Sequence, residues 1–121
     1  MKVNPYLCFN GNCSQAVALY EKAFKVKAHT EMNEQNLVGH AEFEIGGIPI
    51  MLFDAPHPLK VGDNIMVSVR FDEAELTVAK FAFDTLKAEG QVIMELGETP
   101  WSKCFGLLVD PFGVQWNLCQ N

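Results

Sequence analysis

One histidine and two glutamates alternate with apolar residues in a short stretch: His40, Glu42 and Glu44 flank Ala41 and Phe43. In a β-strand, residues two positions apart point to the same side, so these three polar side chains would form one row. An imidazole beside carboxylates can exchange protons near neutral pH, which makes His40 a candidate general acid or base. The same alternation is typical of a strand with one face in water. Three interpretations stay open: a solvated face, a ligand-contacting His40, and a metal site on this row.

The four cysteines lack the two-residue spacing of zinc knuckles and redox motifs: Cys8, Cys13, Cys104 and Cys119. We expect free thiols that pack as small hydrophobic side chains. Cys13 is the alternative nucleophile, because it stands at a predicted helix start, where the helix dipole can lower the pKa of a thiol. Among the other histidines, His29 and His57 lie in polar or proline-rich surroundings and are expected on the surface.

The periodicity of apolar residues predicts the elements that position these side chains, in the same order twice. The first half is expected to form a strand, a helix and three strands over residues 6–10, 14–24, 28–33, 40–45 and 48–54. The second half repeats this order over residues 65–71, 73–89, 91–96, 105–109 and 114–119. Asn12 with Gln15, and Asp72 with Glu75, have the spacing of capping boxes. Gly90 is expected to end the second helix.

The closing hairpins of the two halves align without a gap, residues 41–52 with residues 107–118, which places Gly47 opposite Gly113. Two similar segments of about 60 residues indicate an internal duplication rather than a solenoid of short repeats. The alternative is that the two halves of an α+β chain resemble each other by chance. The sequence therefore predicts two modules, residues 1–54 and 64–121, joined by a proline-containing connector at residues 55–63.

Motifs along nearly the whole chain resemble those of a known family. The opening is PYLCFNGNC from Pro5, the middle is GHAEF from Gly39, and the close is DPFGVQW from Asp110. With these motifs the chain resembles the PhnB-like proteins of the vicinal oxygen chelate superfamily. That superfamily includes glyoxalase I, extradiol dioxygenases, fosfomycin-resistance enzymes and metal-free bleomycin-binding proteins. The resemblance implies an α+β fold with two βαβββ modules forming a cup-shaped mixed sheet, in one domain over residues 1–121.

PhnB-like proteins have also carried a 3-demethylubiquinone-9 3-methyltransferase label. The nine glycines of this chain are scattered, and only Gly46 and Gly47 are adjacent. No glycine-rich nucleotide loop follows a predicted strand. The sequence therefore does not favour methyl transfer.

Metal-dependent relatives place a histidine or glutamate on the first and last strand of each module. The resemblance assigns these four positions to Pro5, Met51, Asn64 and Asn117, and the internal repeat independently sets Met51 opposite Asn117. Proline has no donor side chain, methionine is a soft ligand unsuited to magnesium, manganese or iron, and asparagine offers a neutral carbonyl. We therefore expect no bound metal and no other cofactor.

If these positions face the cup, two-residue alternation adds six side chains to the same surface: Leu7, Phe9, Phe53, Met66, Ser68 and Gln115. With Met51, Asn64 and Asn117, they would form a mainly apolar lining that suits a small, partly hydrophobic organic ligand. The alternative is that they fill the cup as a second core. Trp101 is expected either to cap the cup or to pack against a partner subunit, whereas Trp116 is expected in the core.

Composition disfavours several classes of partner. The 121 residues carry a formal charge of −6 with both signs interspersed, which disfavours nucleic acid and anionic membrane surfaces. No apolar run approaches the roughly 18 residues that span a bilayer, and no signal peptide is apparent, so a cytoplasmic location is expected. The resemblance implies a homodimer.

Three functions follow from these observations. The preferred one is metal-free binding of a small organic molecule in the cup, with no catalysis. The alternative is a small-molecule enzyme of lyase, isomerase or dioxygenase type, with His40 as acid or base or with an atypical divalent metal site. A third is a structural or regulatory protein whose cup is filled by its own side chains.

Overall fold

A computed structural model describes residues 1–121, and the chain divides into two compact units, Met1–Lys60 and Val61–Asn121. Each unit contains one helix and one four-stranded sheet. No helix combines the length and apolar character needed to cross a membrane. The predicted α+β class and the repeated order of strand, helix and three strands are confirmed.

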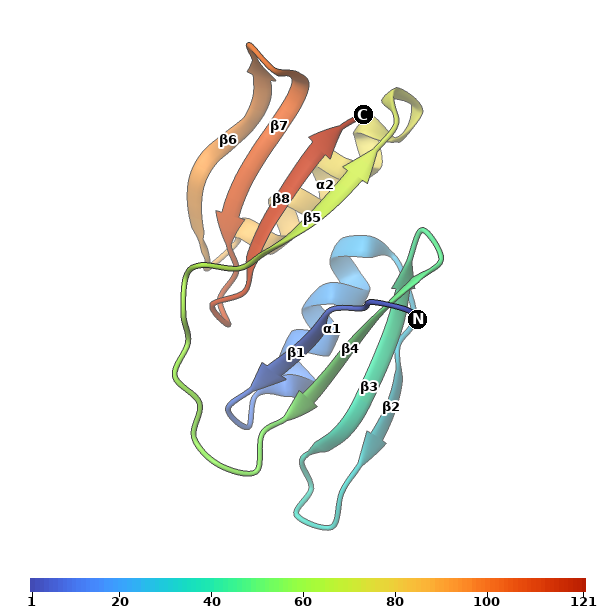
Figure 1. Cartoon of the computed structure of the whole chain (residues 1–121), viewed down its shortest axis with the longest axis vertical. Coiled ribbons are helices and arrows are strands. Elements are labelled where there is room, and N and C mark those ends of the chain that lie inside the picture. Colours follow the sequence, from blue (N-terminus) through green and yellow to red (C-terminus); the bar gives the residue numbers. More distant parts are fainter. The chain divides into compact units, whose positions relative to one another are not determined.

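The first unit follows the predicted order closely. Its elements are β1 (Tyr6–Phe9), α1 (Cys13–Phe24), β2 (His29–Met32), β3 (Val38–Ile45) and β4 (Ile48–Asp54). The sheet order is β1-β4-β3-β2, with β1 parallel to β4 and the other neighbours antiparallel. Figure 1 shows α1 along one face of this sheet, which leaves the opposite face free of any helix of the unit. We call these the helix side and the open side.

The second unit repeats this arrangement. A short 3₁₀ turn, η1 (Glu73–Glu75), leads into the helix, and the other elements are β5 (Met66–Phe71), α2 (Leu76–Lys87), β6 (Gln91–Thr99), β7 (Ser102–Val109) and β8 (Gln115–Gln120). The sheet order is β5-β8-β7-β6, with β5 parallel to β8. The β6–β7 hairpin is longer than predicted, because Pro100 and Trp101 form its turn. β6 ends three residues later than predicted, and β7 begins three residues earlier.

Alternating burial along the strands defines the helix side of each sheet. In the first unit, Ala41, Phe43 and Leu52 are buried and share this side with Tyr20 of α1. In the second unit, Phe83 of α2 approaches β7 so closely that a Cβ on Gly106 would lie 2.6 Å from its ring. Gly106 therefore permits close packing of α2 on its sheet.

The first helix is capped differently from the prediction. Asn12 precedes α1 without a side-chain capping hydrogen bond, so the predicted Asn12–Gln15 capping box is wrong. The backbone N–H of Cys13 instead donates to Oδ1 of Asp54, at the end of β4, at 3.0 Å. In the second unit, the backbone N–H of Asp72 donates to Oε1 of Glu75 at 2.9 Å, as that capping box requires.

Gly90 has a different role from the predicted one. The residue with a positive φ after α2 is Glu89, at 62°, whereas Gly90 is not in the left-handed region. A Cβ at Gly90 would collide with the backbone carbonyl oxygen of Val109. Gly90 is therefore needed for a close approach of two backbone segments.

The gapless alignment of the two hairpins is wrong by one residue across the turn. Ala41 pairs with Leu52 in the first unit, whereas Gly106, not Leu107, pairs with Leu118 in the second. The first hairpin closes through the glycine pair 46–47, and the second needs the longer turn of residues 110–114. The duplication is therefore a structural repeat whose two turns differ in length.

Candidate functional site

Leu7 and Phe9 lie on the helix side of the first sheet. Leu7 pairs with Leu52, and Phe9 is 3% exposed with its ring 6.5 Å from that of Tyr20 on α1. The prediction that they share a face with Met51 and Phe53 is therefore wrong. It counted the alternation from Pro5, which precedes β1, and an offset of one residue exchanges the two faces of a strand.

Tyr6 and Cys8 take the open-side positions of β1 that the sequence analysis missed. Tyr6 pairs with Met51, and Cys8 pairs with Phe53. The rings of Tyr6 and Phe53 are 4.9 Å apart and meet edge to face. Counting the alternation backwards from the apolar Phe9, taken as a core residue, would have found this face.

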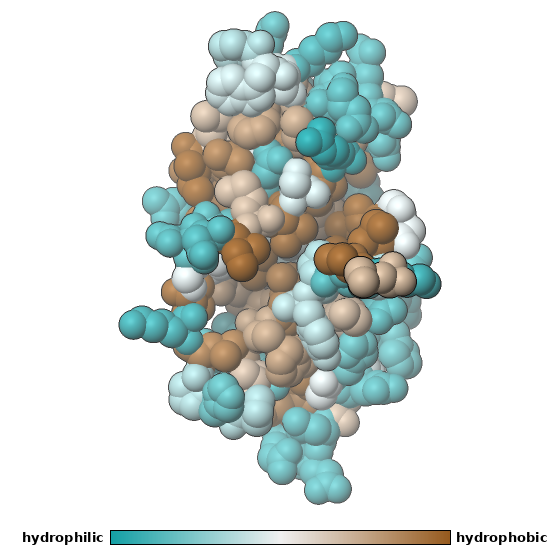
Figure 2. All heavy atoms as spheres, viewed as in Figure 1, coloured by the Kyte–Doolittle hydropathy of each residue, from teal (hydrophilic) through white to brown (hydrophobic).

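The open side of the second sheet gathers four of the predicted lining residues. Met66 pairs with Gln115, and Ser68 pairs with Asn117. In Figure 2 the face of this sheet that lies opposite α2 carries mainly hydrophobic residues with a few polar ones among them. Asn64 lies exposed before β5 begins, outside the sheet, so its predicted place in a strand is wrong.

The amide of Asn117 is held by its neighbours. The Ser68 hydroxyl donates to its Oδ1 at 2.7 Å, and its Nδ2 donates to the Gly106 carbonyl at 3.0 Å. Gln115 is similarly buried, and its Nε2 donates to the Ile65 carbonyl at 3.4 Å. These hydrogen bonds fix both amides in the sheet surface.

The register also shows which pairs correspond in the two sheets: Tyr6 and Met51 pair in the first sheet, where Ser68 and Asn117 pair in the second. A phenol, a thioether, a hydroxyl and a hydrogen-bonded amide do not fit a hard divalent cation, which takes carboxylate and imidazole donors. No group of three or more His, Cys, Asp or Glu side chains is placed to hold a metal ion. The metal-dependent chemistry of the superfamily therefore does not fit these residues.

His40 lies in a hydrogen-bonded chain on the open side of the first sheet. Its Nδ1 is 3.2 Å from the Tyr6 hydroxyl, and its Nε2 is 3.4 Å from Oε1 of Glu42. The carboxylate can only accept, so Nε2 carries the proton in the neutral ring and Nδ1 accepts from the Tyr6 hydroxyl. The side chains of His40 and Glu42 are 32% and 40% exposed, so both are accessible from solvent.

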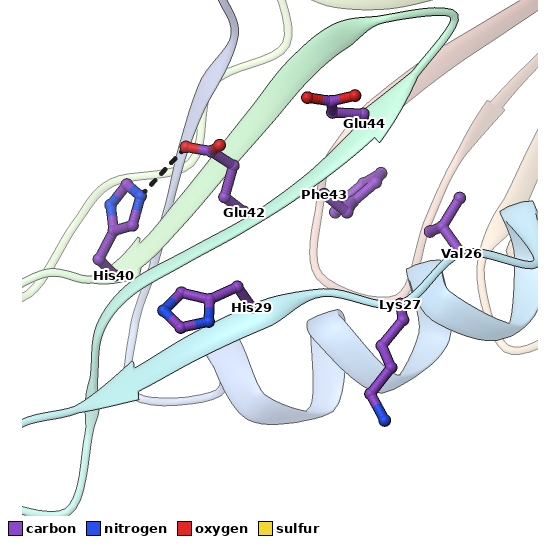
Figure 3. Close-up of a pocket in the computed structure, with 7 residues that line it drawn as sticks. All are labelled: Val26, Lys27, His29, His40, Glu42, Phe43 and Glu44. Atoms are coloured by element: carbon purple, nitrogen blue, oxygen red, sulfur yellow. Dashed lines mark hydrogen bonds and ion pairs between the residues drawn. The ribbon is translucent and has the colours of Figure 1, made fainter.

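A shallow pocket of about 580 Å³ borders His40 and Glu42. Its other lining residues come from β2, β3 and the segment after α1: Val26, Lys27, His29, Phe43 and Glu44. Figure 3 shows the Glu42 carboxylate turned towards the His40 ring, whereas the Lys27 amine points away from both. The row of His40, Glu42 and Glu44 thus lies beside a pocket large enough for a small molecule.

The remaining histidines lie on the surface, as predicted. His29 is exposed and pairs its Nε2 with Oε1 of Glu31 at 3.4 Å. His57 is exposed in the connector, where it borders a second shallow pocket of about 440 Å³. Neither histidine joins the chain formed by Tyr6, His40 and Glu42.

All four cysteines are free thiols. Cys13 is buried at the start of α1, and burial, with smaller effects from Asp54 and Cys8, raises its pKa to about 12. Cys13 is fully buried, and its raised pKa disfavours the thiolate that a nucleophile needs, so the structure does not support the alternative of an activated Cys13. Cys8 and Cys119 lie on the open sides of their sheets, and burial raises the pKa of Cys8.

Trp101 is exposed at the turn between β6 and β7. Its ring contacts that of Phe105 edge to face at 5.5 Å. Trp116 is fully buried, as predicted, and its Nε1 donates to Oδ2 of Asp110 at 2.9 Å. The two tryptophans therefore have different roles, and Trp101 is the one available to a ligand or partner.

Comparison with known proteins identifies the family. The model of the Glyoxalase/Bleomycin resistance protein/Dioxygenase superfamily matches residues 2–118. Protein YjdN of Escherichia coli (strain K12) is 31% identical over 137 aligned positions, which cover 96% of this chain and 92% of YjdN.

Solved structures show the same fold. Protein PA1353 from Pseudomonas aeruginosa is 27% identical with a TM-score of 0.86, and the match covers 100% of this chain and 98% of that one. A Bacillus cereus PhnB protein, described as a putative 3-demethylubiquinone-9 3-methyltransferase, is 26% identical with a TM-score of 0.82, over 100% of both chains. These matches, together with the βαβββ order of both units, show that the chain is a PhnB-like member of the glyoxalase/bleomycin resistance protein/dioxygenase superfamily.

Proposed function

We propose that the chain binds a small, partly hydrophobic organic molecule on the open sides of its sheets, without a metal ion. The observation that carries this proposal is the set of corresponding positions Tyr6, Met51, Ser68 and Asn117, none of which offers a carboxylate or an imidazole. The open side of the first sheet also carries Phe53, and that of the second carries Met66. The amide of Asn117 is held in place by its hydrogen bonds. An apolar surface with a few fixed polar groups is typical of small-molecule sites.

The wider predictions belong to the same proposal. The single domain over residues 1–121, with its connector at residues 55–63, stays a prediction, as do the homodimer and the cytoplasmic location. The third hypothesis, a structural role with a filled cup, predicts that no small molecule binds.

Methionine methyl groups offer a direct test of this binding. Three of the five methionines lie on the open sides: Met51, Met66 and Met94, the last paired with Leu107. We expect uncharged aromatic probes such as 4-ethylphenol to shift these three ¹³C-methyl signals saturably in chelator-treated protein, because ring currents act over short distances. Met1, at the exposed N-terminus, and Met32, half-exposed on edge strand β2, are internal controls.

Saturable shifts at open-side methyl groups, with the controls unmoved, would support the proposal. Binding that appears only after addition of a divalent metal would contradict the metal-free part. Uniformly unchanged methyl signals across a library of such probes would contradict binding itself.

A second candidate function rests on the chain formed by Tyr6, His40 and Glu42. We infer that these three hydrogen-bonded side chains can move a proton. His40 accepts the hydroxyl proton of Tyr6 at Nδ1, and the Tyr6 oxygen at the same time takes a proton from a ligand. Glu42 then stabilises the imidazolium of His40. No electrons are transferred, and return of the proton completes an exchange or isomerisation. This candidate is an acid–base enzyme rather than a binding protein.

Deuterium exchange separates the two candidates. If Tyr6, His40 and Glu42 are catalytic, the protein should speed the exchange of acidic C–H protons of small ketones for deuterium in D₂O. Tyr6→Phe and His40→Asn should each lower this exchange rate by about 100-fold. His57→Asn, on the connector, should leave the rate unchanged. A wild-type rate equal to that of buffer would exclude this activity for these ketones, and full activity of His40→Asn would show that any exchange arises elsewhere.

A further inference from the structure

The second sheet carries the only arginine of the chain, and its guanidinium forms no ion pair. Arg70 is exposed near the end of β5, although Asp and Glu outnumber Lys and Arg by 15 to 9 in the sequence. The four ion pairs of the structure involve two histidines and Lys87 instead. An exposed guanidinium that forms no ion pair has its donors available for a ligand on this open side.

The strand register places Arg70 at one end of a row that leads to an aromatic surface. Arg70 pairs with Cys119 of β8, and Cys119 pairs with Phe105 of β7, so the three side chains share the open side. The Trp101 ring extends this surface beyond Phe105. Neighbouring strands are about 4.8 Å apart, so the backbones of Arg70 and Phe105 are separated by roughly 10 Å. A single substituted ring with one charged group spans this distance.

The polar groups beside Arg70 are already paired with each other. Ser68, two residues earlier on the same side, donates to Asn117, and Asn117 donates to the Gly106 carbonyl. The open-side residues of β5, β8 and β7 include no aspartate or glutamate: Met66, Ser68, Arg70, Gln115, Asn117, Cys119, Phe105, Leu107 and Val109. The charge of Arg70 is therefore not cancelled within this surface.

We propose that Arg70 binds the carboxylate of a small organic acid whose apolar body packs against Phe105 and Trp101. The planar guanidinium presents parallel N–H donors that match the two carboxylate oxygens. The Ser68–Asn117 pair, in the row beside Arg70 and Cys119, adds no carboxylate that would compete for the guanidinium. This inference rests on the proposed binding function and adds the charge of the ligand to it.

A matched pair of probes tests this assignment: 4-ethylbenzoate and the uncharged 4-ethylbenzamide, titrated into the full chain and followed by the Met66 and Met94 methyl signals. The wild type should bind the acid about tenfold more tightly than the amide, since hydrogen bonds between charged groups are the stronger ones. Arg70→Gln should remove this preference and leave amide binding unchanged. Arg70→Lys should retain part of it, because it keeps the charge without the planar donor pair.

Lys80→Gln is the matched control, because it removes one positive charge from the exposed surface of α2 in the same unit. This variant should keep the full preference for the acid. Equal affinities of the wild type for acid and amide, or a preference that survives in Arg70→Gln, would overturn the role of Arg70 while leaving the proposed function intact. Binding of neither probe would overturn both, and melting temperatures would confirm that each variant is folded.

Discussion

Replacing Asp54 with alanine should lower the free energy of unfolding by about 2 to 5 kcal/mol, measured by urea denaturation. Its buried carboxylate accepts two backbone hydrogen bonds, from Cys13 at the start of α1 at 3.0 Å and from Val38 at the start of β3 at 2.9 Å. Alanine would leave both N–H groups buried without an acceptor, and each such loss is costly. The carboxylate thus ties the start of α1, the start of β3 and the end of β4 together.

Asn12→Ala is the control for this prediction. Asn12 occupies the N-cap position but makes no capping hydrogen bond through its side chain, so its loss should change stability by less than about 0.5 kcal/mol. A larger effect for Asn12→Ala than for Asp54→Ala would mean that the helix is capped locally after all. Asp54→Asn, which keeps one carbonyl acceptor, should fall between the two.

In the second unit, Asp110→Ala should destabilise the chain by about 3 to 5 kcal/mol. The carboxylate is 3% exposed, and its Oδ1 accepts from the N–H groups of Phe112 at 2.9 Å and Val114 at 3.1 Å. Its Oδ2 accepts from Nε1 of the fully buried Trp116. Loss of the carboxylate would therefore release the β7–β8 turn and leave the indole N–H without this acceptor.

Two further variants separate these contributions. Asp110→Asn keeps an oxygen for the two turn N–H groups but places an amide donor against the indole, so we expect about half of the loss seen with alanine. Asp63→Ala, at an exposed position, should have an effect below about 0.5 kcal/mol. Equal stability of Asp110→Ala and Asp63→Ala would refute the structural role of Asp110.

These two aspartates illustrate why side-chain partners were harder to predict than elements. The predicted strands placed Asp54 at the end of a strand and Asp110 in the connection between two strands, and both placements are confirmed. The partners of Asp54 lie 41 and 16 residues away, so no local spacing indicates them. The local motif therefore predicted that Asn12 caps α1, whereas the acceptor at the start of this helix is the carboxylate of the distant Asp54.

The candidate site was predicted in part, and the errors share one cause. In the second sheet, Met66, Ser68, Gln115 and Asn117 lie on one side, as the alternation from Asn64 and from Asn117 predicted. In the first sheet, the count began at Pro5, one residue out of phase, so Leu7 and Phe9 were assigned to the side that Tyr6 and Cys8 occupy. The side-chain period of a strand is two, and an error of one position is enough to exchange its faces.

By itself, the sequence determined the α+β class, the doubled βαβββ order and the family, because apolar periodicity and turn residues are local properties that any fold must respect. The tertiary structure alone decided which polar groups meet. It brought Tyr6 beside His40, paired Ser68 with Asn117 and left Arg70 without a carboxylate. These contacts depend on strand register between segments 34 to 49 residues apart, and register is a property of the assembled sheet rather than of any one strand.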